Sequence, residues 1–210
     1  AHRGRAGGAR ALAGLAPAMR LAVSNIAWTP DDDAIAGAAL TAAGLHAIEV
    51  APTVRWPAPL EVPRAEAAAW RAWWHDRGID VVAMQSLLFG RPDLVVFGPP
   101  GVRAALVDYL GGICRLAAWL GATRLVFGSP ANRRPGDLAP AERDAVAVEV
   151  FRAIGQRASD EGVTVCIEAN PRAYGCEWIQ SVSEAAALVT AVDHPGLGLP
   201  LDAGGMLLHG

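Results

Sequence analysis

The stretch GVTVCIEANP, residues 162–171, contains the pattern that organises the whole chain. A run of apolar and β-branched residues, typical of a buried strand, leads directly into a carboxylate, Glu168. A charged group at the end of a buried strand costs free energy unless something compensates it. We therefore expect Glu168 to face a polar cavity that it shares with the ends of other strands.

The same pattern recurs along the chain. Short β-branched runs predict six strands, within residues 20–28, 46–52, 78–86, 122–130, 162–171 and 196–205. Helical stretches separate these runs, and the alternation predicts a parallel sheet covered by helices, with strands that are apolar on both faces. Polar residues gather at the predicted strand exits: Ser24, Asn25, Glu49, Gln85, Ser86, Ser129, Glu168, Asn170 and Asp202.

Two topologies fit alternating βα units, the closed barrel and the open doubly wound sheet. The open sheet usually carries a glycine-rich phosphate loop after its first strand, whereas here that strand runs into NIAWTPDD, residues 25–32. The sequence therefore favours an α/β (β/α)8 TIM barrel. Such a barrel normally needs about 250 residues. We expect residues 19–210 to hold its first six units, truncated after the sixth strand, and residues 1–18 to be a disordered or spurious extension.

Composition narrows the chemistry. All 18 basic residues are Arg, which excludes a lysine Schiff base or a Walker-type phosphate lysine within these residues. The net charge of −3 argues against nucleic acid as a partner, and no apolar run reaches membrane-spanning length. Three Cys, an odd number without close pairing, predict reduced thiols and a cytoplasmic location.

Two carboxylates, Glu168 and Asp202, end consecutive predicted strands. In a barrel they would lie near each other at the mouth, where they would repel and one would take up a proton. A divalent cation between them removes that penalty, and oxygen ligands suit Mg²⁺ or Mn²⁺, with Zn²⁺ or Co²⁺ if a His joins them. The alternative is that each carboxylate caps a loop or pairs with an Arg.

The sequence resembles the xylose isomerase-like TIM-barrel superfamily, and more closely its sugar phosphate isomerase/epimerase members, over nearly all of residues 19–210. The resemblance is carried by LAVSNIAW, GLHAIEVAP, QSLLFGRPDLVVFG, LGATRLVFGSPANRR, VCIEANPRAYGCEW and LPLDAGGM. It implies that Glu168 and Asp202 are metal ligands at the ends of the fifth and sixth strands. It also implies two further ligands, typically a His and a Glu, from strands that would follow Gly210.

The resemblance implies an enzyme that isomerises or epimerises a sugar or sugar phosphate by proton transfer next to a carbonyl. Glu168 would then be a general base as well as a ligand, while the metal polarises the carbonyl. Without the eighth-strand Glu, a fragment would be inactive. There is one departure, because Gly205 stands where many epimerases of the superfamily have a substrate-contacting His.

Two alternatives remain, and the departure at Gly205 leaves room for the first of them. A non-catalytic sugar-binding or regulatory barrel would keep the pocket and lose the metal. A relative of the endonucleases that act at abasic DNA sites would share the superfamily, but it would rely on His residues where this chain has Gln85, Ser129 and Gly205. The acidic net charge also places the endonuclease far behind the isomerase.

Six residues are candidates for contacts to a small-molecule sugar or sugar phosphate: Asn25, Glu49, Gln85, Asn132, Arg133 and Asn170. The amides would bond hydroxyl groups, or else satisfy loop backbone. Arg133, with Arg134, would bind a phosphate or carboxylate, or else be solvated. Trp70, Trp73 and Trp74 form one helix edge that either packs in the core or makes a subunit interface, so a homo-oligomer stays open.

Overall fold

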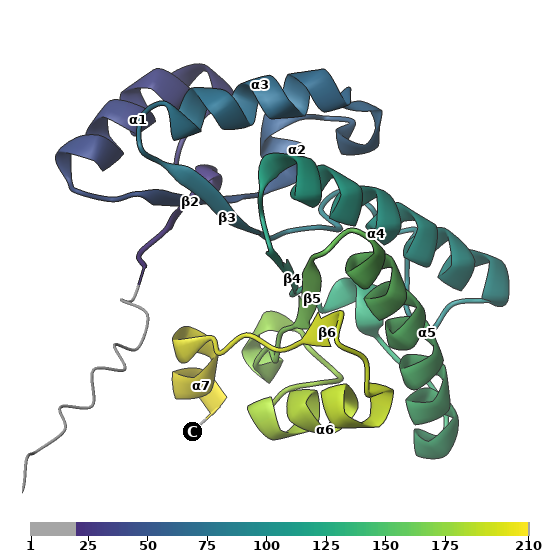
Figure 1. Ribbon diagram of the computed structural model, residues 1–210. Helices are drawn as coiled ribbons and strands as arrows, with labels where there is room; N and C mark the ends of the chain where they lie inside the picture. The colour runs from purple at the N-terminus through teal and green to yellow at the C-terminus, as the bar shows by residue number, and fades with distance from the viewer. Residues whose placement is uncertain (1–19, 210) are drawn as a thin grey trace, which may run out of the picture.

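The computed structural model describes residues 20–209, so the predicted extension at 1–18 lies outside the described residues. Six parallel strands pair in sequence order to form a single sheet, with β1 and β6 at its edges (Figure 1). The strands are β1 Val23–Ser24, β2 Ala47–Val50, β3 Asp80–Met84, β4 Arg124–Phe127, β5 Thr164–Ile167 and β6 Leu197–Gly198. The predicted parallel βα order is therefore confirmed.

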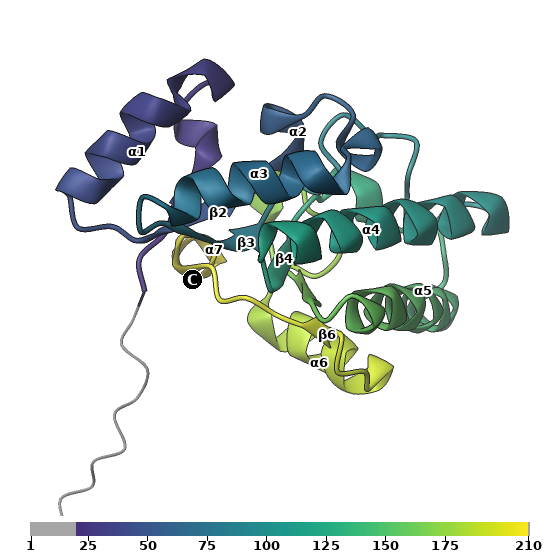
Figure 2. The ribbon, with the colours of Figure 1, turned by 45° about the horizontal axis from the view of Figure 1, so that its top comes forward.

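Helices alternate with the strands and lie around the outside of the sheet in Figure 1. They are α1 Asp33–Ala42, α2 Pro52–Arg55, α3 Arg64–His75, α4 Pro100–Leu120, α5 Pro140–Asp160, α6 Val182–Val192 and α7 Ala203–His209. Figure 2 shows α3, α4 and α5 side by side, where successive helices pack on one another. None of the described helices combines the length and the hydropathy that crossing a bilayer would require.

The core lies between this helical layer and the strands. Ile48 of β2, Leu125 of β4 and Val165 of β5 are completely buried, as is Phe151 of α5, whose ring packs 5.4 Å from that of Phe127. Strands buried by helices explain why these runs are apolar on both faces. The strand ends that leave this core are thereby held in fixed positions.

The three tryptophans of α3 belong to this packing. Trp70 and Trp74 are buried, and the Trp74 ring lies 5.7 Å from that of Trp70 and 4.9 Å from that of Trp73. The outer ring, Trp73, is covered by the Arg77 guanidinium at 3.6 Å from its centroid. Of the two alternatives that the sequence left open, core packing accounts for Trp70 and Trp74.

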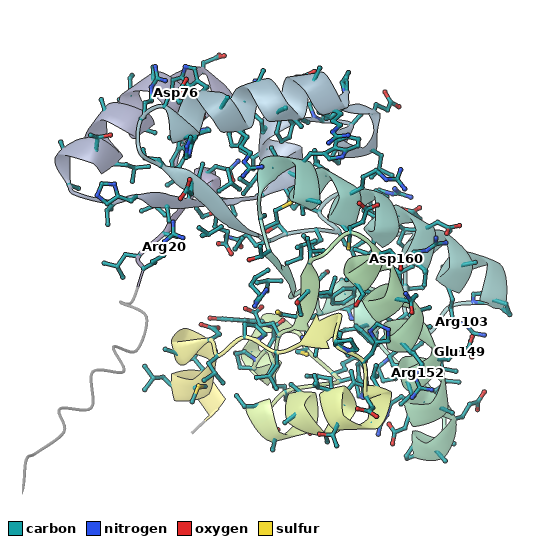
Figure 3. The ribbon with its side chains drawn as sticks, in the orientation of Figure 1. Arg20, Asp76, Arg103, Glu149, Arg152 and Asp160 are labelled. Atoms are coloured by element: carbon teal, nitrogen blue, oxygen red, sulfur yellow. The ribbon has the colours of Figure 1, made fainter. Side chains whose placement is uncertain are left out.

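Local sequence signals fix the helix that follows β5. Ser181 and Glu184 form a capping box, in which the Glu184 amide donates to Ser181 Oγ at 3.2 Å and the Ser181 amide donates to Glu184 Oε2 at 3.3 Å. At the other end of α6, Arg152 of α5 donates to the Val192 carbonyl at 3.0 Å. Figure 3 shows Arg152, Glu149 and Asp160 along α5, and all three side chains are exposed.

The last predicted strand is shorter than the sequence indicated. Residues 196–205 were expected to be extended, whereas pairing covers only Leu197–Gly198 and α7 begins at Ala203. Pro200 cannot donate to a strand ladder, and Asp202 accepts the amides of Gly204 and Gly205, which starts a helix. Asp202 consequently lies at a helix start rather than on a strand.

Candidate functional site

A cavity of about 280 Å³ opens at the carboxyl ends of β3, β4 and β5. Its walls come from Gln85–Phe89 after β3, from Val126–Ser129 at the end of β4, and from Glu168 directly after β5. Glu168 is the one ionisable side chain among these lining residues. The expectation that Glu168 faces a cavity shared with other strand ends agrees with this arrangement.

The Glu168 carboxylate is held on one side only. Its Oε2 accepts a hydrogen bond of 2.7 Å from Asn170 Nδ2, and its backbone amide donates to the Phe127 carbonyl at 3.1 Å. No group within residues 20–209 donates to its Oε1. Gly128 lies so close that an added Cβ would overlap Glu168 Oε2, so with any larger residue at this position the carboxylate would have to move.

Arg133 lies beneath this loop and does not line the cavity. Its side chain is completely buried, and it donates to the Glu168 carbonyl at 2.7 Å and to Asn170 Oδ1 at 2.9 Å. Burial lowers the pKa of the Arg133 guanidinium, because an apolar environment disfavours the charged form. Its neighbour Arg134 is exposed and pairs with Glu177 at 3.4 Å. The two adjacent arginines therefore have different environments.

Gln85 links the cavity to the end of β2. Its Nε2 donates to Glu49 Oε2 at 2.7 Å and to Ser24 Oγ at 2.8 Å. An ionised carboxylate can only accept hydrogen bonds, so the NH₂ group of Gln85 must face Glu49. The Oε1 of Gln85 is then the amide atom available to a ligand in the cavity.

The carboxyl of Glu49 has a raised pKa. Burial is the main cause, and the negative charge of Glu168 adds to it, while the hydrogen bond from Gln85 acts in the opposite direction. Glu49 does not line the 280 Å³ cavity itself. Its role is indirect: it accepts a hydrogen bond from Gln85 and so orients the Gln85 amide, which does line the cavity.

Two other predicted contact residues bond the backbone. Asn25 accepts from the Ala51 amide at 2.7 Å and donates to the Ala51 carbonyl at 3.3 Å, which ties the end of β1 to the end of β2. Asn132 donates to the carbonyls of Arg91 and Leu94 at 2.8 and 2.7 Å and accepts from Ser129. Both amides are buried, which is the structural alternative that the sequence left open.

Asp202 faces a different space from Glu168. Its Oδ1 and Oδ2 accept the amides of Gly204 and Gly205, each at 3.0 Å, at the start of α7. It lines a second cavity of about 290 Å³, between Ala169, the start of α6 and α7. The structure thus places Glu168 in the β3–β5 cavity and Asp202 in the second cavity, whereas the sequence led us to expect both at one mouth.

The donor atoms fit a hard divalent cation only in part. Glu168 and Asp202 provide carboxylate oxygens, each of which has lone pairs beyond those used in its present hydrogen bonds. Within the described part of the chain, however, no three His, Cys, Asp or Glu side chains come together in an arrangement that would hold a metal. These residues supply two candidate ligands rather than a complete metal centre.

The loop after β3 is a part of the site that sequence reasoning missed. Ser86 has a left-handed backbone with φ of +53°, and Leu87 and Leu88 turn inward and are buried. Phe89 also lines the cavity, yet its side chain is 72% exposed. The available signal was the run SLLF, residues 86–89, directly after the polar strand end at Gln85. Apolar residues that continue past the end of a strand indicate a loop that packs inward.

A model of the xylose isomerase-like TIM barrel family matches residues 38–210 of the chain. The chain belongs to this family. The TIM-barrel class expected from the sequence is confirmed, with the described residues forming six successive βα units. No curated protein sequence matches the chain.

Solved structures of this family have the same fold. A D-psicose 3-epimerase from Clostridium cellulolyticum H10, solved with D-tagatose, superposes with a TM-score of 0.73 at 18% identity, over 90% of this chain and 65% of that one. A D-psicose 3-epimerase in the presence of D-fructose gives 0.71 at 22% identity, with 90% and 65% covered. The IolI protein with a bound zinc atom gives 0.68 at 16% identity, with 91% and 66% covered. The chain thus spans 65% of the length of each epimerase.

Proposed function

We propose that the protein is a metal-dependent isomerase or epimerase that acts on a sugar or sugar phosphate by proton transfer at a carbon next to a carbonyl. The observation that carries the proposal is the position of Glu168, which lies directly after β5 in a cavity, with one carboxylate oxygen held and the other available. Membership of the xylose isomerase-like family supports it, as does the fold shared with two D-psicose 3-epimerases.

In this proposal Glu168 is the general base. Its available Oε1 would take the proton from the carbon beside the substrate carbonyl, while Asn170 keeps Oε2 in place. Gln85 would accept a hydrogen bond from a substrate hydroxyl through Oε1. The buried side chains of Leu87, Leu88 and Phe127 in the cavity wall would limit water around the reacting atoms.

Glu168 and Asp202 are the residues of this chain that would hold a divalent cation such as Mn²⁺, Mg²⁺, Co²⁺ or Zn²⁺. When bound, the cation would polarise the substrate carbonyl and so make the neighbouring carbon more acidic. The bound zinc of the IolI protein supports a metal in this family. Elemental analysis of the purified full-length protein tests this part directly, and equimolar divalent metal is the expected result.

The activity is tested with the ketoses that the related structures contain. The full-length protein is incubated with D-fructose, D-tagatose or D-psicose and Mn²⁺ in D₂O, and the products are separated by chromatography. Conversion with deuterium incorporated at one carbon is expected. Glu168→Gln should lower kcat by about 10²–10⁴-fold, because the base is lost at nearly constant volume. Glu149→Gln, which alters an exposed glutamate on α5, is the matched control and should leave kcat unchanged.

A non-catalytic sugar-binding barrel is the second candidate. The observation in its favour is that Asp202 caps α7 and that no third metal-binding side chain joins the two carboxylates within residues 20–209. This candidate predicts saturable sugar binding by calorimetry, with no deuterium incorporation and no retained metal. Catalytic turnover by the metal-loaded protein would exclude it.

A further inference from the structure

The inference starts from an unusual charge in the interior. Arg133 is the largest completely buried polar side chain of the described residues, and no carboxylate oxygen lies within ion-pair distance of it there. Its Nε is also buried without a hydrogen-bond partner. A buried cation without a directly paired anion is strongly unfavourable, so its retention calls for a specific role.

The remaining Arg133 donors all face the loop that follows β5. One Nη donates to the Glu168 carbonyl at 2.7 Å, and the other donates to Asn170 Oδ1 at 2.9 Å and to Cys176 Sγ at 3.5 Å. Residues 131–133 form a short 3₁₀ helix after β4, so this side chain ties the β4 exit to the β5 exit. One guanidinium thus contacts both the backbone of Glu168 and the side chain that touches its carboxylate.

The orientation of the Asn170 amide follows from this contact. Arginine has no acceptor atom, so it must be Oδ1 that faces Arg133. The Nδ2 group is therefore turned toward Glu168, where it donates to Oε2 at 2.7 Å. A flipped amide would set two donors against each other on one side and two acceptors on the other. Asn170 consequently presents a donor to Glu168 whenever Arg133 is in place.

We propose that Arg133 is a positioning residue that, through Asn170, fixes the Glu168 carboxylate with Oε2 held and Oε1 turned to the cavity. The anion that compensates the buried guanidinium is then Glu168, reached through one intervening amide. What Glu168 does once it is positioned rests on the proposed function above. The positioning itself is a property of the side chains Arg133, Asn170 and Glu168 and can be tested separately.

The first test removes the link. Asn170→Ala leaves the direct bond from Arg133 to the Glu168 carbonyl and frees Oε2. Loss of a group that orients a metal ligand typically weakens metal affinity about 10–100-fold, and this is the expected change in the Kd for Mn²⁺ measured by calorimetry. Glu177→Gln is the matched control, since Glu177 is an exposed residue of the same loop that pairs with Arg134 at 3.4 Å and lines neither the cavity of Glu168 nor that of Asp202. It should leave the Kd unchanged.

The second test asks whether Arg133 acts through Asn170. Arg133→Lys keeps the charge but cannot make both bonds at once, so weaker Mn²⁺ binding is expected. In the double variant with Asn170→Ala, the combined loss of affinity should be smaller than the product of the two single losses. Fully independent losses would show that Arg133 does not act through Asn170 and would overturn the proposal.

A structural readout keeps the proposal testable without metal or turnover. Crystal structures of the wild type and Asn170→Ala should differ in the Glu168 side-chain rotamer. Asn170→Asp keeps an acceptor for Arg133 but places a like charge against Glu168, so Tm should stay close to the wild type while the Glu168 carboxylate turns away. If the wild type binds no Mn²⁺, the metal part of the proposed function fails. The positioning role of Arg133 is then judged from the Glu168 rotamers alone. An unchanged Glu168 rotamer in both variants overturns it.

Discussion

The ends of β5 and β6 both place a carboxylate next to a loop, and they use it in different ways. After β5, Glu168 has one oxygen held by a side-chain amide that a buried arginine orients, and the other oxygen is available to the cavity. After β6, Asp202 has both oxygens on the first amides of α7. The partners of a carboxylate, more than its position after a strand, decide whether it is ready to meet a ligand.

A glycine lies against each carboxylate, and replacing each glycine by alanine tests how differently the two carboxylates are held. In Gly128→Ala the new Cβ would overlap Glu168 Oε2, so the carboxylate must leave its bond to Asn170. Loss of a hydrogen bond to a charged group costs about 1.5–3 kcal/mol of unfolding free energy. We expect a loss in this range by urea denaturation, together with the loss of any Mn²⁺ binding.

Gly205→Ala is the counterpart. The new Cβ would lie 2.9 Å from Asp202 Oδ2, and a small rotation of that flexible carboxylate relieves the contact. Alanine also favours a helix over glycine by about 0.5–1 kcal/mol, which offsets the strain in α7. The net change should stay within about 0.5 kcal/mol of zero. Equal destabilisation by the two substitutions would contradict the distinction between the two strand ends.

Asp202 itself gives the next largest effect. Asp202→Ala removes the cap of α7 and should cost about 0.5–2 kcal/mol, seen as faster hydrogen exchange of the Gly204 and Gly205 amides. Asp202→Asn keeps an oxygen acceptor and should cost only a few tenths, because asparagine caps helices about as well as aspartate. Unchanged amide exchange in Asp202→Ala would show that the cap does not stabilise α7.

Much of this fold could be predicted from local sequence. The alternation of apolar runs and helices determines a parallel sheet, because buried strands need helices on their faces and each unit covers its own strand. The position of Glu168 in a cavity could also be predicted, since a charge that ends a buried strand needs a polar environment. Both signals are local, because each apolar run and the polar residue that follows it are adjacent in the chain.

The partners of the site residues could not be predicted in this way. Adjacent arginines in a loop are expected to be solvated, and Arg134 is exposed while Arg133 is completely buried. The burial of Arg133 depends on Asn170 and Cys176, which lie 37 and 43 residues further along the chain. Asp202 differs for a local reason, because the glycines that follow it gave no signal of a helix start.

The smallest effect that separates the two strand ends is a change in the pKa of Glu49. Burial and the charge of Glu168 raise this pKa, and Asp202 is not among its causes. Glu168→Gln removes a neighbouring negative charge and should lower the pKa of Glu49, whereas Asp202→Asn should leave it unchanged. Titration of the glutamate side-chain carboxyl carbons by NMR measures both variants against the wild type.

The same group makes stability depend on pH. The folded-state pKa of Glu49 lies above its unfolded value, so its contribution to stability is fully present below the unfolded pKa and is lost as pH rises through the folded pKa. Glu168→Gln brings the folded-state pKa of Glu49 closer to its unfolded value, so the loss of unfolding free energy that Glu49 causes as pH rises should become smaller. In Asp202→Asn this loss should be the same as in the wild type. Equal shifts of the Glu49 pKa in the two variants would mean that Asp202 acts on Glu49 as strongly as Glu168 does, and that both carboxylates face one common cavity.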